Sequence, residues 1–122
     1  MTRSRVKIMI SKEGYNLLKS TCIEANKFAR ELIENTDELK IEDNFVLIGW
    51  DDIRWYRGLK DVEVVFDVLD KLDKLINEDS SKLDNYFYKV IEIEENGCIS
   101  EETNDSDGEF TGDFYVNQNF SL

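Results

Sequence analysis

The amino-acid sequence predicts an α+β fold, a two-layer sandwich in which two helices cover one face of a mostly antiparallel sheet of four or five strands. Segments near the start and in the last third alternate apolar and polar residues, as half-buried strands do. Between them, two longer segments repeat apolar residues at three- and four-residue steps, as amphipathic helices do. The predicted order is β-α-β-α-β-β-β. With 122 residues, 41% of them hydrophobic, the chain can form the core of one domain over residues 1–122.

The first strand is predicted at residues 5–10, where Val6 and Ile8 point to the same face. Ser11 follows as an N-cap residue, because its side chain can accept a hydrogen bond from the first turn of a helix. One helix is then expected to run without interruption to about residue 35. Its apolar stripe comprises Tyr15, Leu18, Cys22, Ala25, Ala29, Leu32 and Ile33.

The centre of the chain contributes a short strand and the second helix. Residues 36–44 are predicted to be a polar connection, and residues 45–48 a buried strand that Gly49 ends. The second helix is predicted at residues 61–76 because its apolar residues keep the helical spacing. Its stripe comprises Val62, Val65, Phe66, Leu69, Leu72 and Ile76.

The last third is predicted to be an acidic β region over residues 90–122. Residues 86–94 alternate as a strand, and Asn96–Gly97 indicates a two-residue hairpin turn because both residues tolerate positive φ. The returning strand would then place Glu92 opposite Glu101, which costs up to about 1 kcal/mol for like charges. A loop at residues 104–108 and a last strand at residues 110–120 complete the expected sheet.

The charge of this region is one-sided. No Lys or Arg follows Lys89, and the last third carries most of the net charge of −12. Such a field repels nucleic acid and anionic membranes and attracts basic protein surfaces. We therefore expect a basic protein as the partner, with no direct binding of nucleic acid or membrane. The candidate partner-binding acids are Glu92, Glu94, Glu95, Glu101, Glu102, Asp105, Asp107, Glu109 and Asp113.

Two interpretations of these acids stay open. Glu92 and Glu94 lie on the same strand face about 6.6 Å apart and begin a row of carboxylates. Such a row can imitate the regular negative charge of a nucleic-acid backbone. Alternatively, the acids form a solvated face and an acidic loop that keep the protein in solution. Dimerisation through this region would be opposed by its own charge, so the sequence favours a monomer.

A second candidate region combines aromatic and charged residues. Exposed Trp, Tyr and Arg dominate interface energetics, and this region could anchor a partner through Trp50, Asp51, Asp52, Trp55 and Tyr56. In the alternative interpretation the tryptophans belong to the core, and Asp52 pairs with Arg54 or Arg57.

The sequence contains no recognisable catalytic or metal-binding set. It has no His, so the usual general base at neutral pH and the commonest metal ligand are missing. Cys22 falls on the apolar stripe of the first helix, and Cys98 has no nearby base that would activate its thiol as a nucleophile. The loop at residues 105–109 resembles the start of an EF-hand but lacks the acids required at its first and twelfth positions. We expect no enzymatic activity, no cofactor and no metal.

The sequence also suggests where the protein acts. We expect no signal peptide, because the short apolar run near the start is interrupted by Lys7. No stretch approaches the roughly 20 apolar residues of a membrane span. These observations predict a cytoplasmic protein. Ile, Lys and Asn are frequent and Pro is absent, as in proteins encoded by AT-rich genomes, which suggests a bacterial host cell.

Residues 46–56, which read VLIGWDDIRWY and precede an amphipathic helix, resemble small proteins of phages and mobile elements. In size, charge and lack of catalytic groups the chain is similar to anti-CRISPR and other anti-defence proteins that imitate DNA. This resemblance implies an inhibitor of a nucleic-acid-binding enzyme such as a nuclease. Immunity proteins that neutralise nuclease toxins are similar in the same respects. A third alternative is a small-molecule sponge or small enzyme that uses the loop at residues 50–57, with Arg54 and Arg57 as contacts for an anion.

Overall fold

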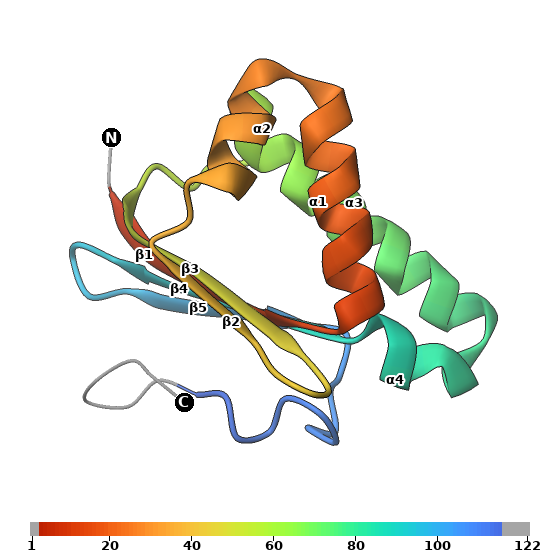
Figure 1. Cartoon of the computed structure of the whole chain (residues 1–122). Coiled ribbons are helices and arrows are strands. Elements are labelled where there is room, and N and C mark those ends of the chain that lie inside the picture. Colours follow the sequence, from red (N-terminus) through yellow and green to blue (C-terminus); the bar gives the residue numbers. More distant parts are fainter. Residues whose placement is uncertain (1–2, 116–122) are drawn as a thin grey trace.

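The computed structural model describes residues 3–115 of the chain (Figure 1). Its elements are β1 (Ser4–Ile10), α1 (Lys12–Ala25), α2 (Lys27–Glu34), β2 (Glu38–Ile41), β3 (Val46–Ile53), α3 (Lys60–Glu78), the 3-10 turn η1 (Ser80–Lys82), α4 (Leu83–Tyr86), β4 (Tyr88–Glu94) and β5 (Ile99–Thr103). The strands form one open sheet in the order β2-β3-β1-β4-β5, and every neighbouring pair is antiparallel. The predicted α+β sandwich is confirmed.

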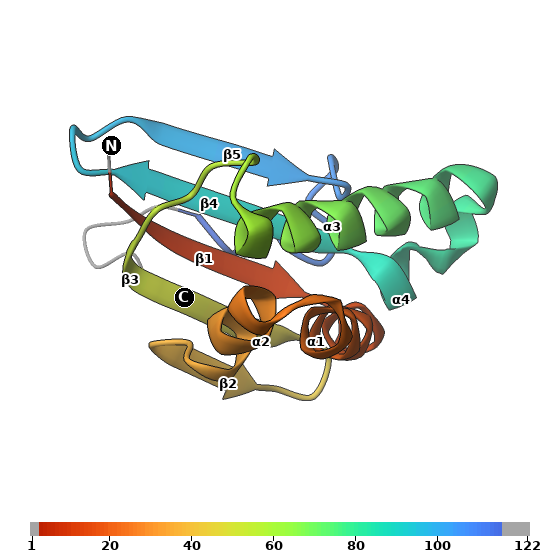
Figure 2. The same cartoon turned by 90° about the horizontal axis from the view of Figure 1, so that it is seen from above.

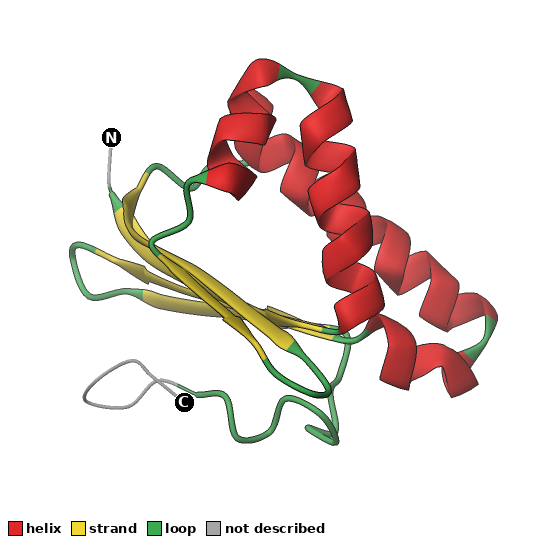
Figure 3. Ribbon diagram, in the orientation of Figure 1, coloured by secondary structure: helices red, strands yellow, loops and turns green. Residues whose placement is uncertain are grey.

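The three long helices lie together on one face of the sheet (Figure 2, Figure 3). Val6, Ile8 and Ile10 of the central strand β1 face them and are fully buried. The apolar stripes of α1 and α3 pack on this surface, with Leu18 and Leu69 at 0% exposure. The predicted strand β1 and the predicted helix α3 are therefore both present. β1 is not half-buried as expected, because Lys7 and Met9 on its second face are each 4% exposed.

The predicted first helix is interrupted at Asn26. This residue is extended, with φ −166° and ψ 168°, and separates α1 from α2. Its side-chain oxygen accepts a hydrogen bond from Ala29 N at 2.8 Å, which caps α2, and its amide donates to Lys60 O at 3.2 Å. Asn side chains compete with helical hydrogen bonding in this way. The prediction of one uninterrupted helix was wrong, although α2 ends at Glu34 as expected.

The connection after α2 contains a strand that the sequence did not predict. β2 occupies Glu38–Ile41 at the edge of the sheet. Its four residues alternate polar and apolar side chains, but the run is too short to stand out from the polar connection around it. β3 continues through Gly49, which stands opposite Lys7 of β1 and Glu38 of β2. The Lys7 and Glu38 side chains meet beside the glycine in an ion pair of 2.9 Å. A Cβ on residue 49 would lie 3.3 Å from Lys7 Cγ, so glycine at this position leaves room for the ion pair. Gly49 was predicted to end the strand, but β3 continues through it.

The β4–β5 hairpin differs from prediction by one residue of register. A hydrogen bond of 2.9 Å from Glu94 N to Cys98 O closes a three-residue loop, with Gly97 at φ 89°. This loop type adds one residue to the two-residue turn. Ser100 therefore stands opposite Glu92, and Glu101 stands opposite Ile91. The predicted opposition of Glu92 and Glu101 was wrong, and the cost of opposed like charges does not arise.

The chain after β5 covers part of the second sheet face (Figure 1). Phe114 is fully buried there against Met9, Leu47 and Ile91. Residues 110–113 form turns and not the predicted strand, because Gly112 N donates to Gly108 O at 3.1 Å and the chain reverses. Residues 114 and 115 are not part of a strand either. Residues 116–120 of that predicted strand lie outside the described residues. No helix between residues 3 and 115 combines the length and apolar content that crossing a membrane requires.

Candidate functional site

The nine C-terminal acids do not gather on one surface. By strand register, Glu92, Glu94 and Glu102 share the side of the β4–β5 hairpin that faces the helices, whereas Glu101 points to the other side. Glu95 lies in the hairpin loop. The remaining four acids follow β5 at the opposite end of β4: Asp105, Asp107, Glu109 and Asp113.

Several hairpin carboxylates already have partners within the fold. Glu92 accepts a hydrogen bond of 2.7 Å from Ser4 Oγ, and Glu95 accepts one of 3.3 Å from Arg3 N. Glu102 lies 3.5 Å from the Arg57 guanidinium. The regular row of free carboxylates that the sequence suggested is thus divided between two sides and partly engaged.

Asp105 is a buried anchor of the C-terminal loop. Its carboxylate accepts hydrogen bonds from the backbone of Glu109, Phe110 and Thr111 and from the Thr111 hydroxyl, at 2.8–3.1 Å. Burial opposes ionisation of this carboxyl group, but these hydrogen bonds outweigh burial and hold its pKa below the ordinary value. Asp105 therefore fixes the loop from within and is not available at the surface.

The tryptophans of residues 50–57 belong to the core, as the alternative interpretation expected. Trp50 is 5% exposed and Trp55 is 6% exposed. Trp50 Nε1 donates to Leu32 O at 3.1 Å, and the two indole rings are 5.4 Å apart. Tyr56 is half-buried. The two tryptophans present little surface to a partner.

The charged residues of this region are paired differently from the alternatives considered. Asp52 accepts a hydrogen bond of 2.6 Å from Arg3 Nε, in place of the expected Arg54 or Arg57. Asp51 lies 3.9 Å from Arg5 Nε. The Arg57 guanidinium lies over the Phe66 ring at 4.1 Å and also approaches Asp70 and Glu102. An anion at Arg57 would have to compete with two carboxylates.

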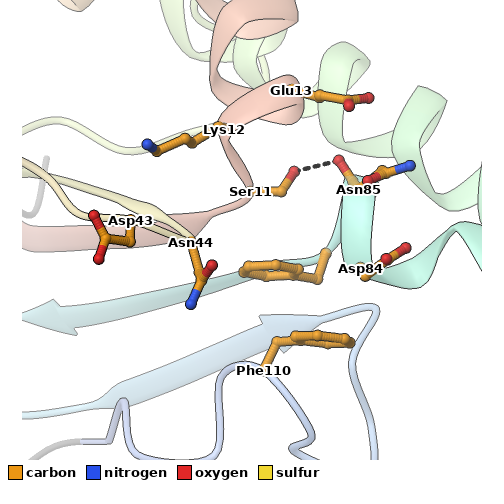
Figure 4. A pocket seen from close by; sticks show the side chains of 9 residues that line it. Ser11, Lys12, Glu13, Asp43, Asn44, Asp84, Asn85 and Phe110 are labelled. Atoms are coloured by element: carbon orange, nitrogen blue, oxygen red, sulfur yellow. Dashed lines mark hydrogen bonds between the residues drawn. The ribbon is translucent and has the colours of Figure 1, made fainter.

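A cavity of about 470 Å³ lies where four segments distant in the sequence meet. They are the start of α1, the β2–β3 turn, α4 and the loop after β5 (Figure 4). Figure 4 shows Lys12 and Asp43 on one side of it and Glu13 and Asp84 on the other. Its lining consists of Ser11, Lys12, Glu13, Asp43, Asn44, Asp84, Asn85, Phe87 and Phe110.

A second cavity of about 420 Å³ adjoins the first, because both are lined by Asn44, Phe87 and Phe110. It adds Met9, Phe45, Glu109 and Asp113. We call the two cavities together the Phe87–Phe110 groove.

The floor of this groove is an ordered aromatic pair. The rings of Phe87 and Phe110 stack with centroids 4.9 Å apart and planes inclined by 6°. Ser11 fixes the first ring, since its N–H donates to Phe87 O at 3.0 Å and its hydroxyl to Asn85 O at 2.6 Å. Asp105 fixes the second through Phe110 N at 2.9 Å. Both rings are thus held by hydrogen bonds of their own backbone segments.

The rim of the groove is acidic. The lining of the groove carries one lysine, Lys12, and five exposed carboxylates, those of Glu13, Asp43, Asp84, Glu109 and Asp113. An aromatic floor with negative walls suits the aliphatic stems and cationic heads of Lys or Arg side chains. Within residues 3–115, no three His, Cys, Asp or Glu side chains are grouped so that they could hold a metal ion.

Sequence reasoning found two residues of this groove, Glu109 and Asp113, and missed the others. The missed residues fall on four separate segments, and no motif links them. Phe110 could be recognised only by its place next to an acidic loop. Comparisons with protein-family models, with curated proteins and with solved structures gave no match.

Proposed function

We propose that this protein is an acidic inhibitor that binds a basic, nucleic-acid-binding surface of another protein. The Phe87–Phe110 groove would receive a basic segment of that target. The observation that carries the proposal is the stacked aromatic floor beneath five carboxylates and a single lysine. Catalysis is no part of the proposal, because the groove offers no nucleophile with an adjacent base.

The groove would bind through two physical effects. An arginine of the target would lay its guanidinium over the outer face of Phe110, the less buried ring of the pair, where a desolvated cation–π contact contributes up to about 2 kcal/mol. The rim acids would accept charge-assisted hydrogen bonds from the same group. Acids elsewhere on the surface, including Asp107 and Glu101, would act at longer range and mainly speed the encounter.

The biological setting we favour is a phage anti-defence protein in the cytoplasm of a bacterial host, with a nuclease as the target. The same groove would serve an immunity protein against a nuclease toxin. The two settings predict different neighbouring genes: phage genes in the first, and a toxin gene directly adjacent in the second.

The docking site can be tested with a labelled oligoarginine peptide. We expect saturable binding to the native protein, with the largest amide shifts in nuclear magnetic resonance at Ser11, Asn85 and Phe110. Phe110→Ala and Asp84→Lys should each weaken binding about tenfold. Phe28→Ala and Asp67→Lys are the matched controls, since Phe28 is 53% exposed and both residues lie outside the groove.

Equal losses in the groove variants and in the controls would show diffuse attraction to net charge and would reject the groove as the docking site. Direct binding of the purified protein to DNA or RNA would reject the inhibitor proposal itself.

A further inference from the structure

The two edge strands of the sheet differ in charge. β5 carries Glu101 and Glu102, so a second copy pairing with β5 would bring acids against acids. Charged edge strands of this kind protect a sheet from self-association. β2 has the sequence Glu-Leu-Lys-Ile, with one residue of each charge, and it lies at the other edge of the sheet.

β2 also presents apolar side chains to solvent. Leu39 is 50% exposed and Ile41 is 64% exposed, and both are among the few large apolar residues that the described chain leaves exposed. By strand register they share one face, opposite Ile48 and Val46 of β3. An edge strand with exposed apolar residues and balanced charge lacks the usual protection against pairing.

Within residues 3–115, no strand pairs with the outer side of β2. Glu42 N donates to Phe45 O at 2.9 Å, so the peptide groups of residue 42 point toward β3. In an antiparallel strand the N–H and C=O groups of alternate residues point to the same side. Those of Glu38 and Lys40 therefore also point toward β3. Leu39 and Ile41 therefore direct their N–H and C=O groups away from the sheet.

We propose that β2 pairs with β2 of a second copy of this chain, antiparallel and about a two-fold axis at Leu39. In this register Leu39 of one copy faces Leu39 of the other and exchanges two backbone hydrogen bonds with it. Glu38 of each copy stands opposite Lys40 of the other, so each of the two charge pairs joins opposite signs. The result is one continuous sheet of ten strands.

Two neighbouring registers fit less well. Moving the two-fold axis to residue 40, which slides the strands past each other by two residues, places Lys40 opposite Lys40. Moving it to residue 38 places Glu38 opposite Glu38. Of these three registers, only the one centred on Leu39 is complementary in charge. A register centred on Ile41 would set Lys40 against Glu42, a residue beyond the end of β2. It also keeps the two acidic hairpins apart, because β5 is at the far edge of each sheet from β2.

The interface is short, so the dimer should be in equilibrium with the monomer and not obligate. Each chain carries a net charge of −12, and this long-range repulsion opposes association. Raising salt should therefore strengthen the dimer by screening. Binding of a basic partner depends on attraction between opposite charges, so it should weaken as salt rises.

Sedimentation velocity over a wide concentration range tests the dimer. We expect a dimer fraction that rises with concentration and with salt. Lys40→Glu should raise the dimer dissociation constant about tenfold, because both charge pairs become Glu against Glu. Lys74→Glu makes the same charge change on the exposed side of α3 and should have little effect. A protein that stays monomeric at all concentrations, or two lysine variants that weaken the dimer equally, would overturn the proposal.

Cross-linking tests the register. In a Cys98→Ser background, Leu39→Cys should form a covalent dimer on oxidation, since facing residues lie within disulfide range. Ile41→Cys should not, because the two copies of residue 41 would be roughly 14 Å apart. Cys22 is buried and will not interfere. Cross-linking of both variants to the same extent would contradict the Leu39 register, and circular dichroism checks that each variant is folded.

Discussion

Asp105 holds Thr111 by two hydrogen bonds to one carboxylate oxygen, 2.8 Å from the backbone N–H and 3.0 Å from the hydroxyl. The same carboxylate binds the backbone of Glu109 and Phe110. One acid of the acidic region therefore shapes the loop that carries half of the aromatic floor.

Asp105→Ala should destabilise the protein by about 1–3 kcal/mol, because buried N–H donors lose their acceptor. Asp107→Ala removes an exposed acid from the same loop and should stay within about 0.5 kcal/mol of the wild type. Urea denaturation measures both. Equal stabilities of the two variants would show that the Asp105 hydrogen bonds do not stabilise the loop.

The Asp105 interaction also predicts a dependence on pH. The pKa of this carboxyl group is lower in the folded protein than its ordinary value of 3.8. Its contribution to stability is therefore complete above pH 3.8 and is lost as pH falls through the folded pKa. The stability difference between wild type and Asp105→Asn should be constant at neutral pH and shrink on acidification below about pH 4. A difference that grows toward acid pH would contradict the assigned direction of the shift.

Leu18→Ala should destabilise the protein by ~2–5 kcal/mol, because Leu18 is fully buried between α1 and the sheet. Asn16→Ala, on the exposed side of the same helix, is the control and should have a small effect. Thermal and urea denaturation give the comparison. If the two substitutions cost the same, the assigned core face of α1 is incorrect.

The two cysteines should react at very different rates with a thiol reagent. Cys22 is buried, and burial together with the nearby Asp61 raises its pKa to about 11. Cys98 is exposed in the β4–β5 hairpin. We expect one rapidly reacting thiol in the native protein and two after denaturation. Rapid native reaction of both thiols would show that α1 opens readily.

Salt should separate the charge-based part of partner binding from the aromatic part. The Debye length falls from ~10 Å at 0.1 M to ~3 Å at 1 M salt. Association of the Phe87–Phe110 groove with a basic partner should slow about tenfold or more over that range, while dissociation changes less. Stopped-flow fluorescence measures both rates. An association rate independent of salt would show that the acids do not steer the encounter.

Charge reversal tests whether the β4–β5 hairpin takes part in binding. Changing Glu94 and Glu101 to Lys should leave thermal stability unchanged or slightly raised, because the net negative charge falls. Association with a basic partner should slow as the attraction weakens. Glu92 is left intact in this variant because it accepts the hydrogen bond from Ser4. A loss of stability with unchanged binding would assign the two acids a structural role.

Local pattern was sufficient for β1 and for α3, although the second face of β1 is also buried, with Lys7 and Met9 each 4% exposed. The alternation of β1 and the stripe of α3 predicted both elements, because burial on one side forces a period of two or 3.6 residues. Ser11 was predicted as the N-cap of α1 and accepts a hydrogen bond from Gly14 N at 3.0 Å. The hairpin turn at Asn96–Gly97 was also located from sequence, since positive φ at Gly97 is a local requirement.

Tertiary structure decided the features that depend on distant partners. At the break at Asn26 the side-chain amide donates to the distant carbonyl group of Lys60. The continuation of β3 through Gly49 accommodates the ion pair of Lys7 with Glu38. The Phe87–Phe110 groove joins residues of four segments that only the folded chain brings together. Sequence periodicity reports which side of an element is buried, because burial acts on each segment separately. Which segments meet is set by the packing of the whole core, and this information is not local.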